Sequence, residues 1–129
     1  MPTLRRALAL LLLAAASHAG SAVAQTVNSE NRVVTVVIAK VPPGVPRAKL
    51  NKGIAASVPT YQKIPGLLAK FFTVNDDTYG GAYLWKDRAA AEAWFTPELV
   101  ARIKARSGVD PQIIYYDSPV QLDNRTATR

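Results

Sequence analysis

A single lysine, Lys70, lies inside the segment LLAKFFTV, residues 67–74, which is otherwise apolar apart from one threonine. Soluble chains rarely place a lysine in such a run unless that side of the segment faces a cavity, a partner or solvent. In a cavity, burial would lower the pKa of the amine, and its ammonium form could orient an anionic or enolate-like ligand. The alternative is a lysine that extends to the sheet edge or pairs with a carboxylate across a dimer.

Aromatic side chains follow the same alternation as Lys70. In an extended strand, Phe72 lies on the same side as Leu68 and Lys70, and Tyr83 and Trp85 share one side of the strand that returns after the turn. We predict that these two sides form one surface. Phe72 and Trp85 would supply an apolar wall there, and Tyr83 would donate a hydrogen bond to a ligand.

A further phenol comes from the last predicted strand, as either Tyr115 or Tyr116. Alternation does not decide between the two, and Tyr116 is the candidate that we assign to the site. For all the aromatic candidates, and for Trp94, the alternative is plain packing in a core or an interface.

The other motifs in this region are structural. Asp76 and Asp77 are typical of a solvated turn and not of an acid pair. The pair Gly80 and Gly81 lies inside a strand without the helix start of a phosphate-binding loop, so we interpret it as a point of close backbone approach or a bulge.

The elements that must position these residues are read from periodicity and from turn residues. Strands are predicted at 33–39, 67–74, 79–85 and 112–117. One helix should begin near Pro46, with Leu50, Ile54 and Val58 on its apolar side, and end or kink at Pro59. A second should begin after Asp87, divide at Thr96 and Pro97, and end at Gly108. The order β-α-β-β-α-β predicts an α+β, ferredoxin-like fold.

The strands are apolar on both of their alternating sides, as in VVTVVIA at 33–39. We expect the small side chains Ala82 and Leu84 to pack under the helices, and the aromatic set to face a pocket or a partner. A chain of this size cannot cover both faces of the sheet. A second copy packed sheet against sheet would do so, which predicts a homodimer with an enclosed space between the two sheets.

Composition excludes several kinds of chemistry. The chain has no cysteine, and its only histidine and methionine are His18 and Met1. A chain cleaved after Ala24 therefore offers no imidazole, thiolate or thioether ligand, so no metal site and no cofactor is predicted. Basic residues exceed acidic ones, for a net charge of +7, but they are dispersed, and a nucleic-acid partner is not expected.

The N-terminal residues 1–24 are typical of a cleaved signal peptide. Arg5 and Arg6 precede a short run of leucine and alanine, and small residues stand before Gln25. The apolar run is shorter than the ~20 residues that span a bilayer, so no membrane attachment is expected after cleavage. Residues 25–129 would form a single domain, either periplasmic or secreted.

The segments PGLLAKFF at 65–72, GGAYLW at 80–85 and AAAEAWF at 89–95 together resemble the YdhR-type monooxygenase-like proteins. These proteins belong to the dimeric α+β barrel superfamily, which includes the antibiotic-biosynthesis monooxygenases. The resemblance implies a ferredoxin-like homodimer, and it suggests oxygen insertion into a phenol- or quinol-type substrate without metal, flavin or haem. An export signal and the lack of histidine beyond that signal are departures from the family pattern.

Three hypotheses for function follow. The first is an exported, cofactor-independent monooxygenase-like protein that acts on a small aromatic molecule. In that hypothesis Lys70 is the catalytic residue, and Phe72, Tyr83, Trp85 and Tyr116 bind the substrate. The second is a non-catalytic exported binding or stress-related module that uses the same cavity. The third is a structural dimer in which the aromatic residues only pack.

Overall fold

The computed structural model describes residues 27–28 and 31–125 of the chain. The predicted signal segment 1–24, its cleavage point and the last four residues lie outside this part. None of the helices in the described residues is long and apolar enough to cross a membrane.

A four-stranded antiparallel sheet forms the centre of the fold. Its spatial order is β3-β4-β2-β5, and a separate two-stranded pair joins β1 to β6. The strands are β1 (Val27–Asn28), β2 (Val33–Lys40), β3 (Leu67–Val74), β4 (Thr78–Trp85), β5 (Gln112–Asp117) and β6 (Val120–Gln121). This order, with a helical crossover after β2 and another after β4, confirms the predicted ferredoxin-like α+β fold.

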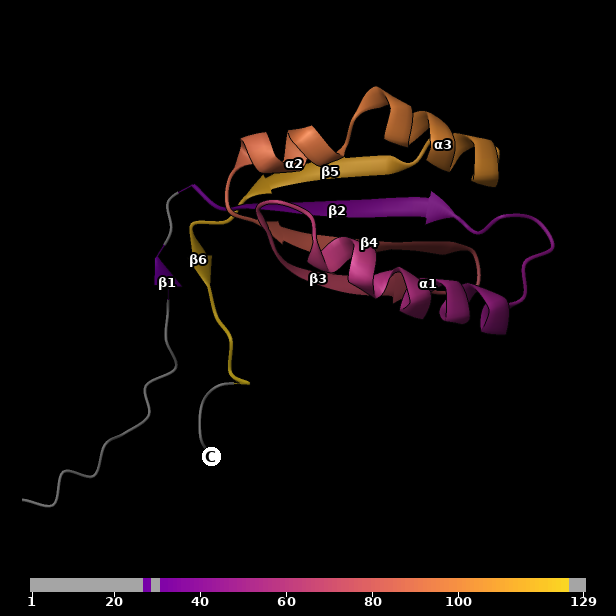
Figure 1. Cartoon of the computed structure of the whole chain (residues 1–129), viewed down its shortest axis with the longest axis horizontal. Coiled ribbons are helices and arrows are strands. Elements are labelled where there is room, and N and C mark those ends of the chain that lie inside the picture. Colours follow the sequence, from indigo (N-terminus) through magenta and orange to yellow (C-terminus); the bar gives the residue numbers. More distant parts are fainter. Residues whose placement is uncertain (1–26, 29–30, 126–129) are drawn as a thin grey trace, which may run out of the picture.

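The helices are α1 (Arg47–Gln62), α2 (Arg88–Trp94) and α3 (Pro97–Ser107). Helix α1 runs along the β3 and β4 side of the sheet, while α2 and α3 run along β2 and β5 (Figure 1). The predicted break between α2 and α3 is confirmed. The Oγ of Thr96 accepts a hydrogen bond from the N–H of Leu99, and Pro97 occupies the first turn of α3.

The sequence predicted that helix α1 ends or kinks at Pro59, and the structure shows that it does not end there. Pro59 lies inside the helix, which continues for one more turn to Gln62. That turn matters because it carries Tyr61 over the sheet, where its ring meets those of Phe72, Tyr83 and Trp94. Val58, expected on the apolar side, is instead 37% exposed.

Strand β3 contains a bulge near its start, between Leu67 and Ala69. The bulge leaves Leu68 half-exposed, so Leu68 does not share a face with Lys70 as predicted. Leu67 packs against the core instead. Beyond the bulge the register is regular, and Lys70 lies opposite Tyr83 on β4, as expected for two residues of one surface.

The two faces of the sheet have the reverse of the predicted roles. The helices cover the face that carries the aromatic side chains. Its buried core contains Val33, Val37, Ile64, Tyr83, Trp85 and Ala91. The face of Ala82 and Leu84 is not covered by a helix, and it exposes large apolar side chains such as Phe71. The reason is volume, because bulky rings fill the wide space under helices better than small aliphatic groups do.

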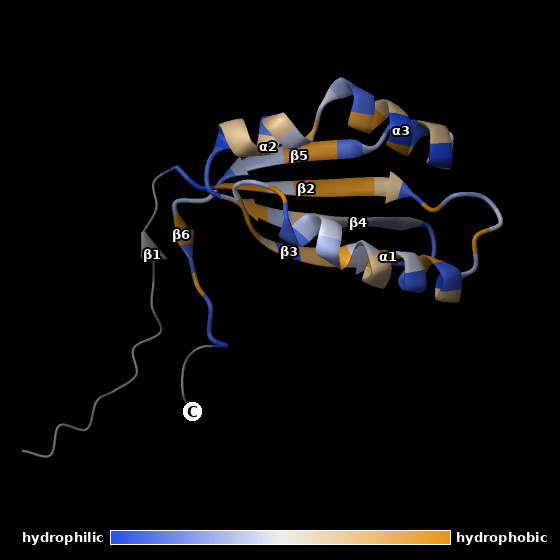
Figure 2. Ribbon diagram, in the orientation of Figure 1, coloured by the Kyte–Doolittle hydropathy of each residue, from blue (hydrophilic) through white to orange (hydrophobic). Residues whose placement is uncertain are grey.

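The central strand β2 is apolar over most of its length (Figure 2), in line with its position in the middle of the sheet. Its helix-facing residues are buried, including Thr35, which is fully covered. The Thr35 hydroxyl Oγ1 accepts a hydrogen bond of 2.9 Å from Nε1 of Trp85. This bond satisfies two polar groups that would otherwise be costly to bury.

Candidate functional site

A cavity of about 380 Å³ lies between the aromatic face of the sheet and the helices. This cavity lies within one chain, and it differs from the space predicted between the sheets of two copies. The lining residues come from β2, β3, β4 and all three helices, with the loop before α1. They are Val37, Ala39, Pro42, Val45, Lys49, Leu50, Gly53, Ile54, Ser57, Tyr61, Lys70, Phe72, Tyr79, Gly80, Tyr83, Trp94, Phe95, Leu99, Ile103 and Arg106.

Lys70 extends from β3 into this cavity among aromatic rings. Its Nζ lies 3.2 Å from the ring centroid of Tyr61, 3.9 Å from that of Phe72 and 4.4 Å from that of Tyr83. All three rings present their faces to the amine, and this contact stabilises its ammonium form. No carboxylate in the described part of the chain lies within ion-pairing distance of Lys70. The alternative of a carboxylate partner is therefore not realised within the chain.

Burial lowers the pKa of Lys70 from 10.5 to about 7, because the charged amine loses hydration that no carboxylate replaces. At neutral pH both forms of the amine are therefore present. Such a group can hold an anion as an ammonium and accept a proton as a free amine, which fits the chemistry predicted for this position.

Room for Lys70 depends on a glycine across the strand pair. A Cβ placed on Gly81 would lie 3.0 Å from Cε of Lys70 and 2.7 Å from the carbonyl oxygen of Phe71. A side chain at this position would displace the lysine stem. The neighbouring Gly80 confirms the predicted close backbone approach, since its Cβ would lie 1.9 Å from the carbonyl oxygen of Val37.

Tyr83 lies beside Lys70 and is almost fully covered. Burial raises the pKa of its phenol, and the neighbouring Tyr61 and Tyr79 raise it further. The hydroxyl of Tyr83 therefore stays protonated, and a hydrogen bond with Tyr61 contributes to the raised pKa. Its ring stacks on Trp85 with a centroid distance of 5.8 Å and meets Phe95 edge-on at 5.3 Å, which fixes its orientation.

Trp85 does not reach the cavity. It is fully buried, its indole N–H is used by Thr35, and its ring packs between Tyr83 and Phe95. The expected substrate contact of Trp85 is thus replaced by a packing role beneath the site. Phe72, by contrast, lines the cavity as predicted.

Tyr116 lies on the other face of the sheet, where it is 51% exposed, so its assignment to the cavity is corrected. Tyr115 is the residue that points toward the helices. Its ring meets Phe95 at 6.3 Å and lies under the guanidinium of Arg88 at 4.8 Å. It packs beside the cavity without lining it, because β5 is the edge strand under α2.

Tyr61 and Arg106 are among the cavity residues that sequence analysis did not identify. Tyr61 follows Leu50, Ile54 and Ser57 at helical spacing, and this series would have identified it had the helix been continued past Pro59. Arg106, near the end of α3, has the sequence signal of a solvated cation. Only the packing of α3 beside the sheet brings it to the cavity.

The region beyond the cavity mouth contains the turn after β3. Asp76 pairs with Arg47 at 3.1 Å, and Asn75 Oδ1 accepts hydrogen bonds from the N–H groups of Asp77 and Thr78. These contacts agree with the prediction of a solvated turn. Among the described residues, no group of three or more His, Cys, Asp or Glu side chains gathers in one place.

The fold is shared with a solved structure. No known family profile and no curated protein matches the sequence. The NE2512 protein of unknown function from Nitrosomonas europaea aligns with a TM-score of 0.55 at 20% identity, over 70% of this chain and 91% of that chain. SnoaB, a cofactor-independent oxygenase from Streptomyces nogalater, aligns with a TM-score of 0.48 at 17% identity, over 68% of this chain and 93% of that chain. The first likeness shows the fold alone, so function must be argued from the cavity.

Proposed function

We propose that this chain is a cofactor-independent monooxygenase-like protein that acts on a small aromatic phenol or quinol in the cavity. One observation carries the proposal. Lys70 is a buried amine with no carboxylate partner among the described residues, and it lies in an apolar, ring-lined space beside the protonated phenol of Tyr83. A planar, electron-rich ring would lie in the cavity beside these aromatic side chains, and its hydroxyl would be held by Lys70 and Tyr83.

The chemistry requires removal of a proton from the substrate. Roughly half of the Lys70 amine is neutral near pH 7, and in that form it can accept the phenolic proton. The ammonium that results stabilises the phenolate next to it, and the apolar lining excludes water. Phe72 forms one wall of the space in which the ring lies.

The phenolate then reacts with dioxygen, which is the oxidant. In the complete reaction a phenol and dioxygen give a quinone and water. One oxygen atom forms a new bond to ring carbon, the other leaves as water, and the ring loses four electrons to dioxygen. The proton taken up by Lys70 returns to the departing oxygen, so the amine is regenerated.

An oxygen-electrode assay with a panel of naphthols and hydroquinones, corrected for spontaneous oxidation, tests the proposal. We expect saturable uptake whose rate rises through pH 7 as Lys70 loses its proton. The variant Lys70→Met should lose at least 100-fold in kcat. The exposed lysine at the end of α1 supplies the control Lys63→Met, which should keep full activity. Binding of these compounds without any oxygen uptake would instead identify a non-catalytic binding module.

The second part of the proposal is a homodimer formed through the open face of the sheet. This face exposes large apolar side chains, namely Ile38, Leu68, Phe71, Ile114 and Tyr116. Apolar surface of this extent is typical of an interface. A second copy, packed sheet against sheet, would cover it by two-fold symmetry. Sedimentation at micromolar concentration tests this, and a stable monomer would leave the open face unexplained.

The signal segment supports the further proposal that the protein works in the periplasm or outside the cell. The segment predicted at 1–24 would be cleaved on export. Intact-mass measurement of the exported protein should give a chain that begins at Gln25.

A further inference from the structure

The charges around the cavity are all of one sign. Among its lining residues the ionised side chains are Lys49 on α1, Lys70 on β3 and Arg106 on α3, and the lining includes no aspartate or glutamate. None of these three cations forms an ion pair with a described residue. Asp76, in the turn after β3, already pairs with Arg47, and Asp110, four residues after Arg106, pairs with Lys104. The cavity therefore has a positive potential that the chain itself does not neutralise.

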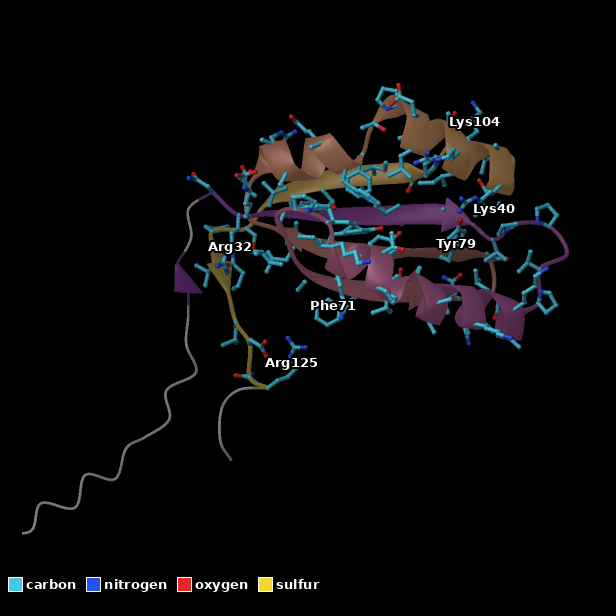
Figure 3. The ribbon with its side chains drawn as sticks, viewed as in Figure 1. Arg32, Lys40, Phe71, Tyr79, Lys104 and Arg125 are labelled. Atoms are coloured by element: carbon cyan, nitrogen blue, oxygen red, sulfur yellow. The ribbon has the colours of Figure 1, made fainter. Side chains whose placement is uncertain are left out.

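These cations occupy two positions along the cavity. Lys70 lies opposite Tyr83 in the middle of the β3 and β4 pair. Lys49 and Arg106 belong to the start of α1 and the end of α3, and these helix ends lie at the same end of the sheet as the start of β4 (Figure 1). Tyr79 marks that end, close to Lys40 (Figure 3).

Arg106 faces the cavity at this outer end. Tyr79 also lines the cavity, and the side chain of Arg106 is in part exposed to solvent. Burial raises the pKa of the Tyr79 phenol, and the positive charge of Arg106 opposes that rise. Lys70 lies opposite Tyr83, and Arg106 comes from the end of α3, so the two cations line one cavity from different elements.

From this arrangement we infer that the natural ligand is an aromatic acid, whose carboxylate binds Arg106 at the outer end while its ring lies against Lys70. The inference names the substrate class of the proposed function and rests on it for the role of the Lys70 end. A guanidinium binds a carboxylate through two parallel hydrogen bonds, and Tyr79 lines the same cavity. Lys49, at the start of α1, adds positive charge to the cavity lining, and we assign it no particular hydrogen bond to the ligand.

Calorimetric titration with matched probes tests this inference. The probes are 3-(4-hydroxyphenyl)propanoate and its primary amide, which have the same shape but differ in charge. We expect the acid to bind at least 10-fold more tightly than the amide to the wild-type protein. The variant Arg106→Gln should remove this preference, because its affinity for the acid should fall about 10-fold while its affinity for the amide stays the same.

The control variant is Lys104→Gln, which removes the same charge from the same helix. Lys104 points away from the sheet and pairs with Asp110 at 3.0 Å on the exposed side (Figure 3). It should keep the full preference for the acid. Equal affinity for acid and amide, or an equal loss in both variants, would overturn the inference, because the second result would reflect net charge alone. Failure of both probes to bind would overturn it as well.

The outcomes separate this inference from the proposed function. If the acid binds through Arg106 but no phenol promotes oxygen uptake, the ligand class stands and the oxygenase proposal fails. If naphthols are oxidised while the acid has no advantage over the amide, the oxygenase proposal stands and the ligand class fails.

Discussion

Replacing Lys70 by methionine should change how the folding stability of this protein depends on pH. The folded-state pKa is about 7, against 10.5 for an ordinary lysine, so between these values the unfolded chain binds one more proton than the folded chain. Wild-type stability should therefore rise with pH across that interval and reach its lower plateau below pH 7. Methionine has a similar length and does not titrate, so the variant lacks this contribution.

The size of the effect follows from the environment of the amine. A pKa lowered from 10.5 to about 7 corresponds to an upper limit of about 5 kcal/mol. The side chain keeps partial contact with solvent, which screens the penalty. Methionine also loses the ammonium contacts with three rings, at about 0.5–1 kcal/mol each. We therefore expect Lys70→Met to be more stable than the wild type by about 1–2 kcal/mol at pH 6, and this gain to shrink by pH 9.5.

Urea unfolding followed by tryptophan fluorescence measures the difference at both pH values. Protein concentration must be the same throughout, because the stability of an oligomer depends on it. The exposed-lysine variant Lys63→Met should differ little from the wild type at either pH. A Lys70→Met gain that is the same at pH 6 and pH 9.5 would refute the argument that the buried ammonium is dehydrated. A gain that grows with pH would mean that folding raises the pKa of Lys70 and does not lower it.

Three further predictions concern the scaffold. Gly80→Ala should prevent folding or lower the stability measured by thermal unfolding by at least about 3 kcal/mol. Gly53 in α1 has open space around it, so Gly53→Ala should raise the stability by about 0.5–1 kcal/mol. Equal effects of the two substitutions would contradict the close backbone approach at Gly80. Thr35→Val should cost about 1–3 kcal/mol in urea unfolding, because the indole N–H of Trp85 loses its acceptor, and an unchanged midpoint would count against this bond. Phe71→Glu places a charge on the open face and should give a monomer on sedimentation, and an unchanged dimer would move the interface elsewhere.

Local sequence pattern identified some of the cavity residues and missed others. Lys70 was identified because its alternation with Phe72 is a local property of one strand, and the antiparallel turn then fixed Tyr83 opposite it. Tyr61 and Arg106 were missed because their positions depend on how α1 and α3 pack over the sheet. A helix residue beside solvent and one beside a cavity have the same sequence signal.

The sequence alone determined the order of the elements, most of their ends and the placement of Lys70 and Phe72 on one surface. These features follow from short-range physics: alternation in strands, side-chain caps at Asp87 and Thr96, and glycine at the end of α3. Only the tertiary structure decided which face of the sheet the helices cover, because both faces are apolar and the choice depends on volume. That choice placed the cavity inside one chain, left Tyr116 on the open face, and brought Arg106 to the outer end of the site.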